Sequence, residues 1–307
     1  MIGNGAARSL GAMSPRTGDL TPNFQDVQRH YDLSDEFFGL FLDDSRTYSC
    51  AYFERDDMTL AQAQLAKIDL SLRKCDLRPG MTLLDIGCGW GATMLRALQR
   101  YDVNVIGLTL SENQYQHVQQ QLATSSANGG CRRAEVRLAG WEEFDEPVDR
   151  IVSIGAFEHF RYARHQHFFD KTYGVLAPNG RMMLHSIVQM GRDIFRMGRK
   201  ITRDDVEFWA FIGREIFPGG ELPLPATIPQ CAEKAGYTVA QVQSLQPHYA
   251  RTLDAWAAAL QARRDEAVQI ASEQTYQTYL RYLTGCADRF RWRHIDVRQY
   301  TLVKHPR

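Results

Sequence analysis

Residues 85–91 read Asp-Ile-Gly-Cys-Gly-Trp-Gly and follow an apolar run at 81–84. This order predicts a strand, a tight loop and a helix. Glycines let a ligand approach the backbone closely because they have no Cβ, and the first turn of a helix offers unpaired N–H groups. Such a loop at the carboxyl edge of a parallel sheet is typical of a site for a nucleotide-like cofactor.

The spacing of the glycines narrows the class of cofactor. A dinucleotide site needs Gly-x-Gly-x-x-Gly with an acidic residue about twenty positions later. Here Asp85 precedes the glycines and Gly91 comes one position early. The Lys and Ser/Thr that a triphosphate site needs do not follow. The pattern is similar to the first motif of S-adenosylmethionine-dependent methyltransferases; a glycine-rich turn without a ligand is the alternative, which the neighbouring motifs disfavour.

The composition excludes several classes of function. Lys plus Arg and Asp plus Glu both number 36, and a net charge near zero disfavours binding to duplex nucleic acid. No apolar run is long enough to span a bilayer. Residues 1–23 lack the apolar core of a signal peptide and are expected to be a disordered leader. We therefore expect a cytoplasmic protein with reduced cysteines, and no metal site because no Cys-x-x-Cys pair occurs.

Strands and helices must position the loop. Predicted strands lie at 82–86, 103–108, 135–139, 149–154 and 181–187, with helices at 92–99, 111–123 and from about residue 164. This alternation predicts an α/β, Rossmann-like fold with a mainly parallel sheet covered on both faces. A later helix at 228–235, a strand at 238–244 and a closing strand at 297–303 bring the sheet to seven strands.

The remaining segments are expected to complete a single domain over residues 24–307. An N-terminal helical cap is expected at 24–78, where Thr59 begins a helix that ends near Cys75. The segment 188–217 breaks the α/β alternation and is expected to form an inserted helical lid. A turn is predicted at residues 178–180, and two helices within 250–290.

Several further motifs lie where strands end and loops begin. Together they resemble the cyclopropane fatty acid synthase family, most closely its branch of mycolic acid cyclopropane synthases and mycolic acid methyltransferases. The resemblance extends from about residue 24 to residue 304. Its most specific pieces are residues 48–55, 85–91, 107–111, 140–142, 156–160, 215–220, 246–249 and 282–286.

The resemblance implies S-adenosylmethionine as the cofactor. It places Tyr48 and Ser49 at the methionine part and Gln114 at the ribose and adenine, where many methyltransferases have an acidic side chain after the second strand. The implied cofactor residues are Tyr48, Ser49, Asp85, Gly87, Cys88, Gly89, Gly91, Thr109, Leu110, Ser111, Gln114, Trp141, Glu142 and Ile154.

The resemblance also implies a reaction. A cis alkene in a long acyl chain takes the sulfonium methyl group, and a bound bicarbonate ion removes a proton so that a cyclopropane closes. The residues implied to hold bicarbonate are Cys50, Glu158, His185 and Tyr249. His and Tyr donate hydrogen bonds to an anion, and Glu accepts one. Cys286 also matches the catalytic set, although a structural role is favoured because the reaction has no use for a thiolate.

The aromatic residues Tyr31, Phe157 and Phe217 are candidates for lining the acyl site, where a ring stabilises a cation; most other aromatics are expected in the core. The basic residues 192, 196, 199 and 200 are interpreted either as a solvated helix face or as a docking patch for an acyl carrier protein. Transient contact with a membrane surface is a further possibility.

The resemblance also implies ring closure, because branches of the family that make hydroxy or methyl-branched products tend to carry Glu at the position of Gly155 and to lose the histidine that matches His185. The alternatives are methyl transfer with water capture, which gives a hydroxy-methyl product, and methyl transfer to another lipid. A protein that binds lipid or cofactor without turnover is a third hypothesis, disfavoured by the intact bicarbonate set.

Overall fold

The structure is a computed structural model that describes residues 35–126, 132–191 and 193–306. The predicted leader at 1–23, the candidate Tyr31 and Arg192 lie outside the described residues. No helix in these ranges is long and apolar enough to cross a membrane.

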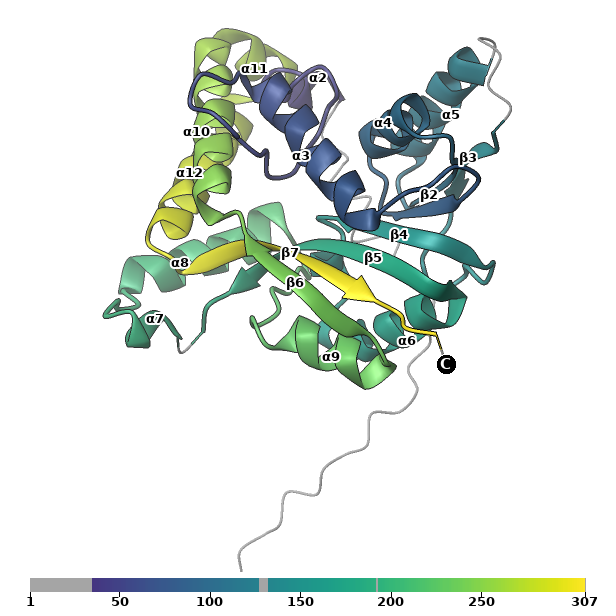
Figure 1. Ribbon diagram of the computed structural model, residues 1–307. Helices are drawn as coiled ribbons and strands as arrows, with labels where there is room; N and C mark the ends of the chain where they lie inside the picture. The colour runs from purple at the N-terminus through teal and green to yellow at the C-terminus, as the bar shows by residue number, and fades with distance from the viewer. Residues whose placement is uncertain (1–34, 127–131, 192, 307) are drawn as a thin grey trace, which may run out of the picture.

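Seven strands form one sheet in the order β3-β2-β1-β4-β5-β7-β6 (Figure 1). All ladders are parallel except those that β7 makes with β5 and β6. This confirms the predicted mainly parallel α/β sheet. The strands are β1 (Thr82–Ile86), β2 (Asn104–Thr109), β3 (Ala134–Leu138), β4 (Val148–Ile154), β5 (Leu176–Gln189), β6 (Thr238–Ser244) and β7 (Ile295–Val303).

Helices cover both faces of the sheet (Figure 1). Leu83 of β1 packs in a core with α3 (Leu60–Cys75), α4 (Ala92–Arg100) and α5 (Glu112–Ser126). Its neighbour Leu84 packs in a second core with α6 (His165–Val175) and α9 (Thr227–Ala235). Successive strand residues point to opposite faces, so a strand buried on both faces reads as a continuous apolar run.

A third core joins the helical segments on one side of the sheet. Its residues, which include Phe37, Trp256 and Tyr279, are almost fully buried. The helices that supply them are α2 (Asp35–Phe38), α8 (Arg203–Phe211), a π-helix (Ile212–Ile216), α10 (Gln246–Ala262), α11 (Arg264–Ile270) and α12 (Glu273–Arg291). The predicted lid segment thus contains α7 (Asp193–Arg196), α8 and the π-helix.

Two local predictions were wrong and one is confirmed. The turn expected at 178–180 belongs to β5, where Asn179 has φ of 62° and the ladder to β4 shifts register. Residues 250–290 contain parts of three helices, because α11 separates α10 from α12. Thr59 caps α3 as expected: Gln62 N–H donates to its Oγ1 at 3.3 Å, and Thr59 N–H donates to Gln62 Oε1 at 3.0 Å.

Candidate active site

The glycine-rich loop joins β1 to α4 and has a backbone that glycine alone adopts easily. Gly87, Gly89 and Gly91 have φ of 76°, 55° and 83°, in the left-handed region that disfavours other residues. A Cβ on Gly87 would lie 2.5 Å from the Cβ of Ala156. The loop therefore packs closely against the chain that follows β4, and a side chain at position 87 would not fit.

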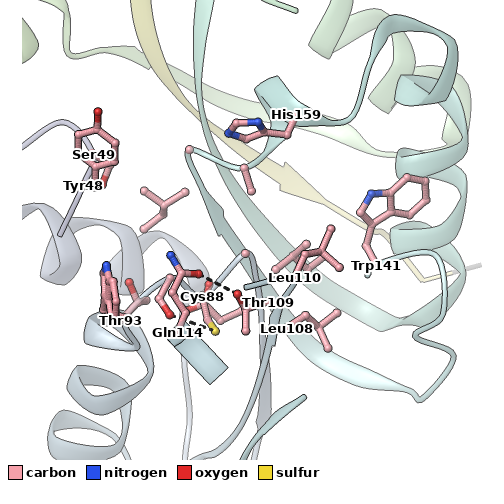
Figure 2. Close-up of a pocket in the computed structure, with 18 of the residues that line it drawn as sticks. Tyr48, Ser49, Cys88, Thr93, Leu108, Thr109, Leu110, Gln114, Trp141 and His159 are labelled. Atoms are coloured by element: carbon pink, nitrogen blue, oxygen red, sulfur yellow. Dashed lines mark hydrogen bonds between the residues drawn. The ribbon is translucent and has the colours of Figure 1, made fainter. Parts of the chain in front are cut away.

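A cavity of about 150 Å³ lies over this loop (Figure 2). Twelve of the fourteen predicted cofactor residues line it: Tyr48, Ser49, Asp85, Gly87, Cys88, Gly89, Thr109, Leu110, Gln114, Trp141, Glu142 and Ile154. Gly91 and Ser111 do not. Gly91 is the N-cap of α4, and Ser111 accepts a hydrogen bond from the Gln114 N–H at 3.4 Å. Both residues therefore support elements that line the cavity without lining it themselves.

One end of the cavity fits a nucleoside. The Thr109 hydroxyl donates to Gln114 Oε1 at 2.8 Å (Figure 2), which leaves the amide N–H groups of Gln114 as donors. Glu142 is held by Arg164 at 2.9 Å through Oε1, while its buried Oε2 has no partner among the described residues. Trp141 stands across the pocket from Tyr48 in Figure 2. A donor, an acceptor and a flat apolar side chain match the edges and face of an adenosine group.

The cavity lining also contains two buried charged residues, Lys67 and Asp85, of which only Asp85 was predicted. Lys67 of α3 also lines the cavity, and its Nζ donates to Ser49 Oγ at 2.8 Å. Burial raises the pKa of Asp85 to about 7 and lowers the pKa of Lys67 to about 8. The signal for Lys67 was present in the sequence, because it occupies the buried stripe of α3 four residues after Ala63.

A second, larger cavity of about 450 Å³ adjoins the first. Tyr48, Ser49, Gly155 and His159 line both, so the two cavities meet beside the glycine loop. The lining is mostly apolar and comes from the lid segment, α10 and α12. Four of the five predicted catalytic residues line this cavity, namely Glu158, His185, Tyr249 and Cys286, together with the predicted acyl contact Phe217.

Glu158 is held at one oxygen and unsatisfied at the other. Ile187 N–H donates to its Oε1 at 2.7 Å, whereas Oε2 is buried without a partner among the described residues. Burial raises the pKa of Glu158 to about 7. The carboxyl group therefore offers a hydrogen-bond acceptor to the second cavity when it is ionised.

His185 offers a hydrogen-bond donor. Lys74 Nζ donates to Gln299 Oε1 at 2.7 Å, so the Gln299 amide nitrogen, 3.3 Å from His185 Nδ1, is the donor in that contact. The proton of the neutral ring then resides on Nε2, which has no partner among the described residues. Burial lowers the pKa of His185 well below its usual value, which keeps the ring neutral.

Burial keeps the remaining predicted catalytic groups protonated. It raises the pKa of the Tyr249 hydroxyl well above its usual value and the pKa of the Cys286 thiol to about 12. It also raises the pKa of the Cys50 thiol. Cys50 is fully buried, its Sγ lies 3.1 Å from the Ala51 carbonyl, and it lines neither cavity. The structure places Cys50 outside the lining of both cavities, and its role beside a bicarbonate ion stays a prediction.

Phe157 does not line the acyl cavity as predicted. It is fully buried in the core below the sheet and stacks on His165, with ring centroids 4.2 Å apart. The residues that line the second cavity in its place include several that sequence reasoning missed: Trp209, Ile212, Leu253, Tyr282 and Phe290. They come from four separate helices, α8, the π-helix, α10 and α12, so no single sequence pattern marks them.

The parallel sheet, the glycine loop and the cavity above it define an S-adenosylmethionine-dependent methyltransferase. Coclaurine N-methyltransferase, with 22% identity and a TM-score of 0.70, has the same fold. The family model described as mycolic acid cyclopropane synthetase matches residues 18–300, and the chain belongs to this family.

Individual relatives agree over nearly the whole chain. Cyclopropane mycolic acid synthases 1 and 3 of Mycobacterium tuberculosis are 57% and 59% identical to it, each covering 93% of this chain and 99% of the relative. The structure of the cyclopropane synthase MmaA2 from the same organism has 57% identity and a TM-score of 0.90, covering 93% of this chain and 100% of that one. Mycolic acid cyclopropane synthase CmaA1, complexed with SAH and CTAB, has 57% identity and a TM-score of 0.89, covering 93% of this chain and 99% of that one.

Proposed function

We propose that the protein transfers a methylene group from S-adenosylmethionine to a cis double bond of a long, meromycolic-type acyl chain and so forms a cyclopropane. The observation that supports this most is the apolar cavity of about 450 Å³, which opens into the cofactor cavity beside Ser49 and Gly155. The mostly apolar lining of this cavity suits a hydrocarbon chain. The place where the two cavities meet suits a double bond that must reach a sulfonium methyl group.

The cofactor, when bound, supplies an electrophilic methyl group that an alkene can take. The protein excludes water from the reacting carbons by surrounding them with apolar side chains such as Tyr282, Leu253 and Phe290. Aromatic rings in this lining also stabilise a developing positive charge. Both effects favour loss of a proton over capture of water.

A base for that proton fits between Glu158, His185 and Tyr249. His185 Nε2–H and Glu158 Oε2 have no partner in the part of the chain that the structure describes. The His185 Nε2–H and the Tyr249 hydroxyl suit the oxygens of an anion, and Glu158 Oε2 suits its hydroxyl hydrogen. An anion that both accepts and donates hydrogen bonds matches bicarbonate, which supplies a base of moderate strength. We propose that these three side chains hold it.

Lipid analysis tests the product. A host that makes unsaturated long-chain acyl groups is given the gene, and its lipids are examined by mass spectrometry and by NMR for cyclopropane protons. Gain of one methylene with loss of the alkene supports the proposal. Gain of a methyl and a hydroxyl group supports the water-capture alternative, and a different methylated lipid supports methyl transfer to another lipid. Purified protein that never releases S-adenosylhomocysteine with any alkene contradicts an enzymatic role.

We further propose that an acyl carrier protein presents the substrate at the lid segment. Arg199 and Lys200 are exposed there, next to Ile201, which lines the mouth of the acyl cavity. The double change Arg199→Glu/Lys200→Glu is expected to slow turnover of a carrier-bound acyl chain and spare a free one. Equal rates would indicate a solvated surface, and co-sedimentation with lipid vesicles would indicate a membrane contact instead. A carrier-bound substrate also implies a cytoplasmic location, which cell fractionation tests.

A further inference from the structure

The acyl cavity has a polar end that the proposed reaction does not use. Gln189 of β5 and Tyr162, which lies before α6, both line it. Gln189 Nε2 donates to the Tyr162 hydroxyl and to the Leu222 carbonyl, each at 2.9 Å, and the Tyr162 hydroxyl donates to the same carbonyl at 2.6 Å. Tyr162 has an exposed fraction of 46%, against 1% for His185. This end of the cavity therefore lies at the surface, and the reacting groups lie inside.

These contacts determine which way the Gln189 amide faces. A backbone carbonyl only accepts, so the amide nitrogen must be the group that faces Leu222. Both N–H groups of that nitrogen are then engaged, which leaves Gln189 Oε1 as the free acceptor of a side chain that lines the cavity. Glu221, which also lines this end, accepts from the Tyr162 N–H. The polar end therefore offers acceptors to a ligand.

The charge of the lining indicates which class of group can bind here. Of the described residues that line this cavity, none is Lys or Arg, so a carboxylate or a phosphate would meet acceptors without a matching cation. A neutral N–H or O–H group would instead donate to Gln189 Oε1 and replace a hydrogen bond that it loses on leaving water. A hydrocarbon chain has no such group. The donor must come from the head of the acyl substrate, as an amide N–H of a carrier's arm or as a hydroxyl group on the chain.

Strand β5 sets the distance from this polar end to the reacting groups. His185, Ile187 and Gln189 are alternate residues of β5, and all three line the cavity. The strand pairs with β7 in unbroken register over this stretch, so it contains no bulge there. Four residues of extended strand lead from His185 to Gln189, which is about 13 Å. A substrate held at both places has a fixed span between its donor and its double bond.

We propose that Gln189 forms a subsite for a hydrogen-bond donor at the head of the acyl substrate, and that this subsite selects which double bond reaches the methyl group. The selection rests on the proposed cyclopropane reaction. Binding at Gln189 does not, because it needs the acyl cavity alone. Tyr162 is a positioning residue, since its hydroxyl accepts from the Gln189 amide nitrogen and so orients Oε1.

Saturated ligands test the subsite without the reaction. The probes are the palmitoyl thioester of N-acetylcysteamine, which has an amide N–H, its ester isostere, in which oxygen replaces that N–H, and the β-hydroxypalmitoyl form of the isostere, which restores a donor on the chain. Calorimetry should show that the isostere binds about 3- to 10-fold more weakly than a probe with a donor, since a neutral hydrogen bond is lost. The probe that binds more tightly identifies the source of the donor. Gln189→Met should remove the preference.

Gln166→Met is the matched control. Gln166 of α6 also donates through Nε2 to a backbone carbonyl, that of Cys231 at 3.3 Å, but it lines neither cavity, so the preference should persist. Tyr162→Phe, which keeps the ring and frees the Gln189 amide, should reduce the preference. The proposal is overturned if the unaltered protein binds all three probes equally, or if Gln189→Met and Tyr162→Phe both keep the preference.

Monounsaturated thioesters with the preferred donor test the selection of a double bond. Across a series in which the double bond moves along the chain, the unaltered protein should show a kcat/KM about threefold or more higher for its best position, and Gln189→Met should flatten this profile. A flat profile in the unaltered protein contradicts the selection and leaves the proposed reaction standing. Absence of turnover for every member contradicts the proposed reaction, and the selection with it, while the binding preference still decides the subsite.

Discussion

Gln299 and His185 meet behind the acyl cavity, and their contact determines which ring nitrogen of His185 bears the proton. The Gln299 amide donates to Nδ1 across 3.3 Å, and Lys74 fixes the amide by donating to its oxygen at 2.7 Å. The ring therefore presents Nε2–H to the cavity. A residue from β7 and one from α3 thus set the hydrogen-bonding character of a residue on β5, without lining the cavity themselves.

Replacement of Gln299 by Leu should release His185 from this arrangement. The neutral ring then samples both tautomers, and turnover is expected to fall about tenfold or more, because the donor to the base is present only part of the time. Nitrogen NMR of labelled histidine should show the mixture, while affinity for S-adenosylhomocysteine stays unchanged. Gln243→Leu is the control: Gln243 accepts from Lys74 at 2.6 Å, whereas the hydrogen bond to the His185 ring among the described residues comes from Gln299. A single unchanged tautomer in Gln299→Leu would contradict the assignment.

Glu158→Gln should retain cofactor affinity and lose most turnover, by about 100-fold or more. The amide oxygen still accepts from Ile187, but the group facing the cavity becomes a donor and no longer accepts the hydrogen of the base. Single-turnover formation of S-adenosylhomocysteine measures the loss, and calorimetry measures binding. Activity near that of the unaltered protein would show that Glu158 does not act on the base.

The same residue makes stability depend on pH. The folded state raises the pKa of Glu158 from 4.5 to about 7, so the folded protein holds this proton more tightly than the unfolded chain. Its contribution to stability is present below pH 4.5 and is lost as pH rises toward 7. Glu158→Gln should therefore raise the free energy of unfolding by up to about 3 kcal/mol at pH 8. Urea unfolding at pH 8 and at pH 5 measures the difference; an equal effect at both would exclude this origin.

Local sequence patterns predicted most helices and strands, whereas the contacts between side chains of the site depend on how these elements pack together. The β1 loop was predictable because its glycines, its preceding apolar run and its helix are contiguous. The α3 helix was predictable from Thr59 and its apolar stripe. The position of the Phe157 ring was predicted wrongly because the residues around it give the same sequence pattern whether the ring faces the core or the cavity.

Lys67 and Gln299, which support the predicted site residues, could not be predicted from the sequence for a related reason. Lys67 and Asp85 both line the cofactor cavity although they come from different elements. Gln299 meets His185 across two antiparallel strands whose register pairs them directly. Register between strands more than a hundred residues apart follows from packing of the whole sheet, and no spacing in the sequence encodes it.

Cys286→Ala should leave turnover within a few-fold of the unaltered protein. The thiol lines the acyl cavity, but burial raises its pKa to about 12, so it is neither a nucleophile nor a base near neutral pH. Iodoacetamide at pH 7.5 should correspondingly fail to inactivate the enzyme on the time scale of modification of an exposed thiol. Rapid inactivation that Cys286→Ala abolishes would show a thiolate at this position.

Gly285→Ala should disturb the acyl cavity and spare the cofactor site. A Cβ on Gly285 of α12 would overlap the ring of Phe208 on α8, so the ring and the part of α8 that carries it must adjust. Trp209 and Ile212, which follow Phe208, line the acyl cavity and would move with it.

We expect the free energy of unfolding to fall by about 1–3 kcal/mol and the KM for the acyl substrate to rise, with affinity for S-adenosylhomocysteine unchanged. Gly174→Ala, in helix α6 where a Cβ meets nothing within 4 Å, is the matched control and should be neutral or stabilising. An unchanged acyl KM in Gly285→Ala would mean that the packing of α8 on α12 does not shape the acyl site.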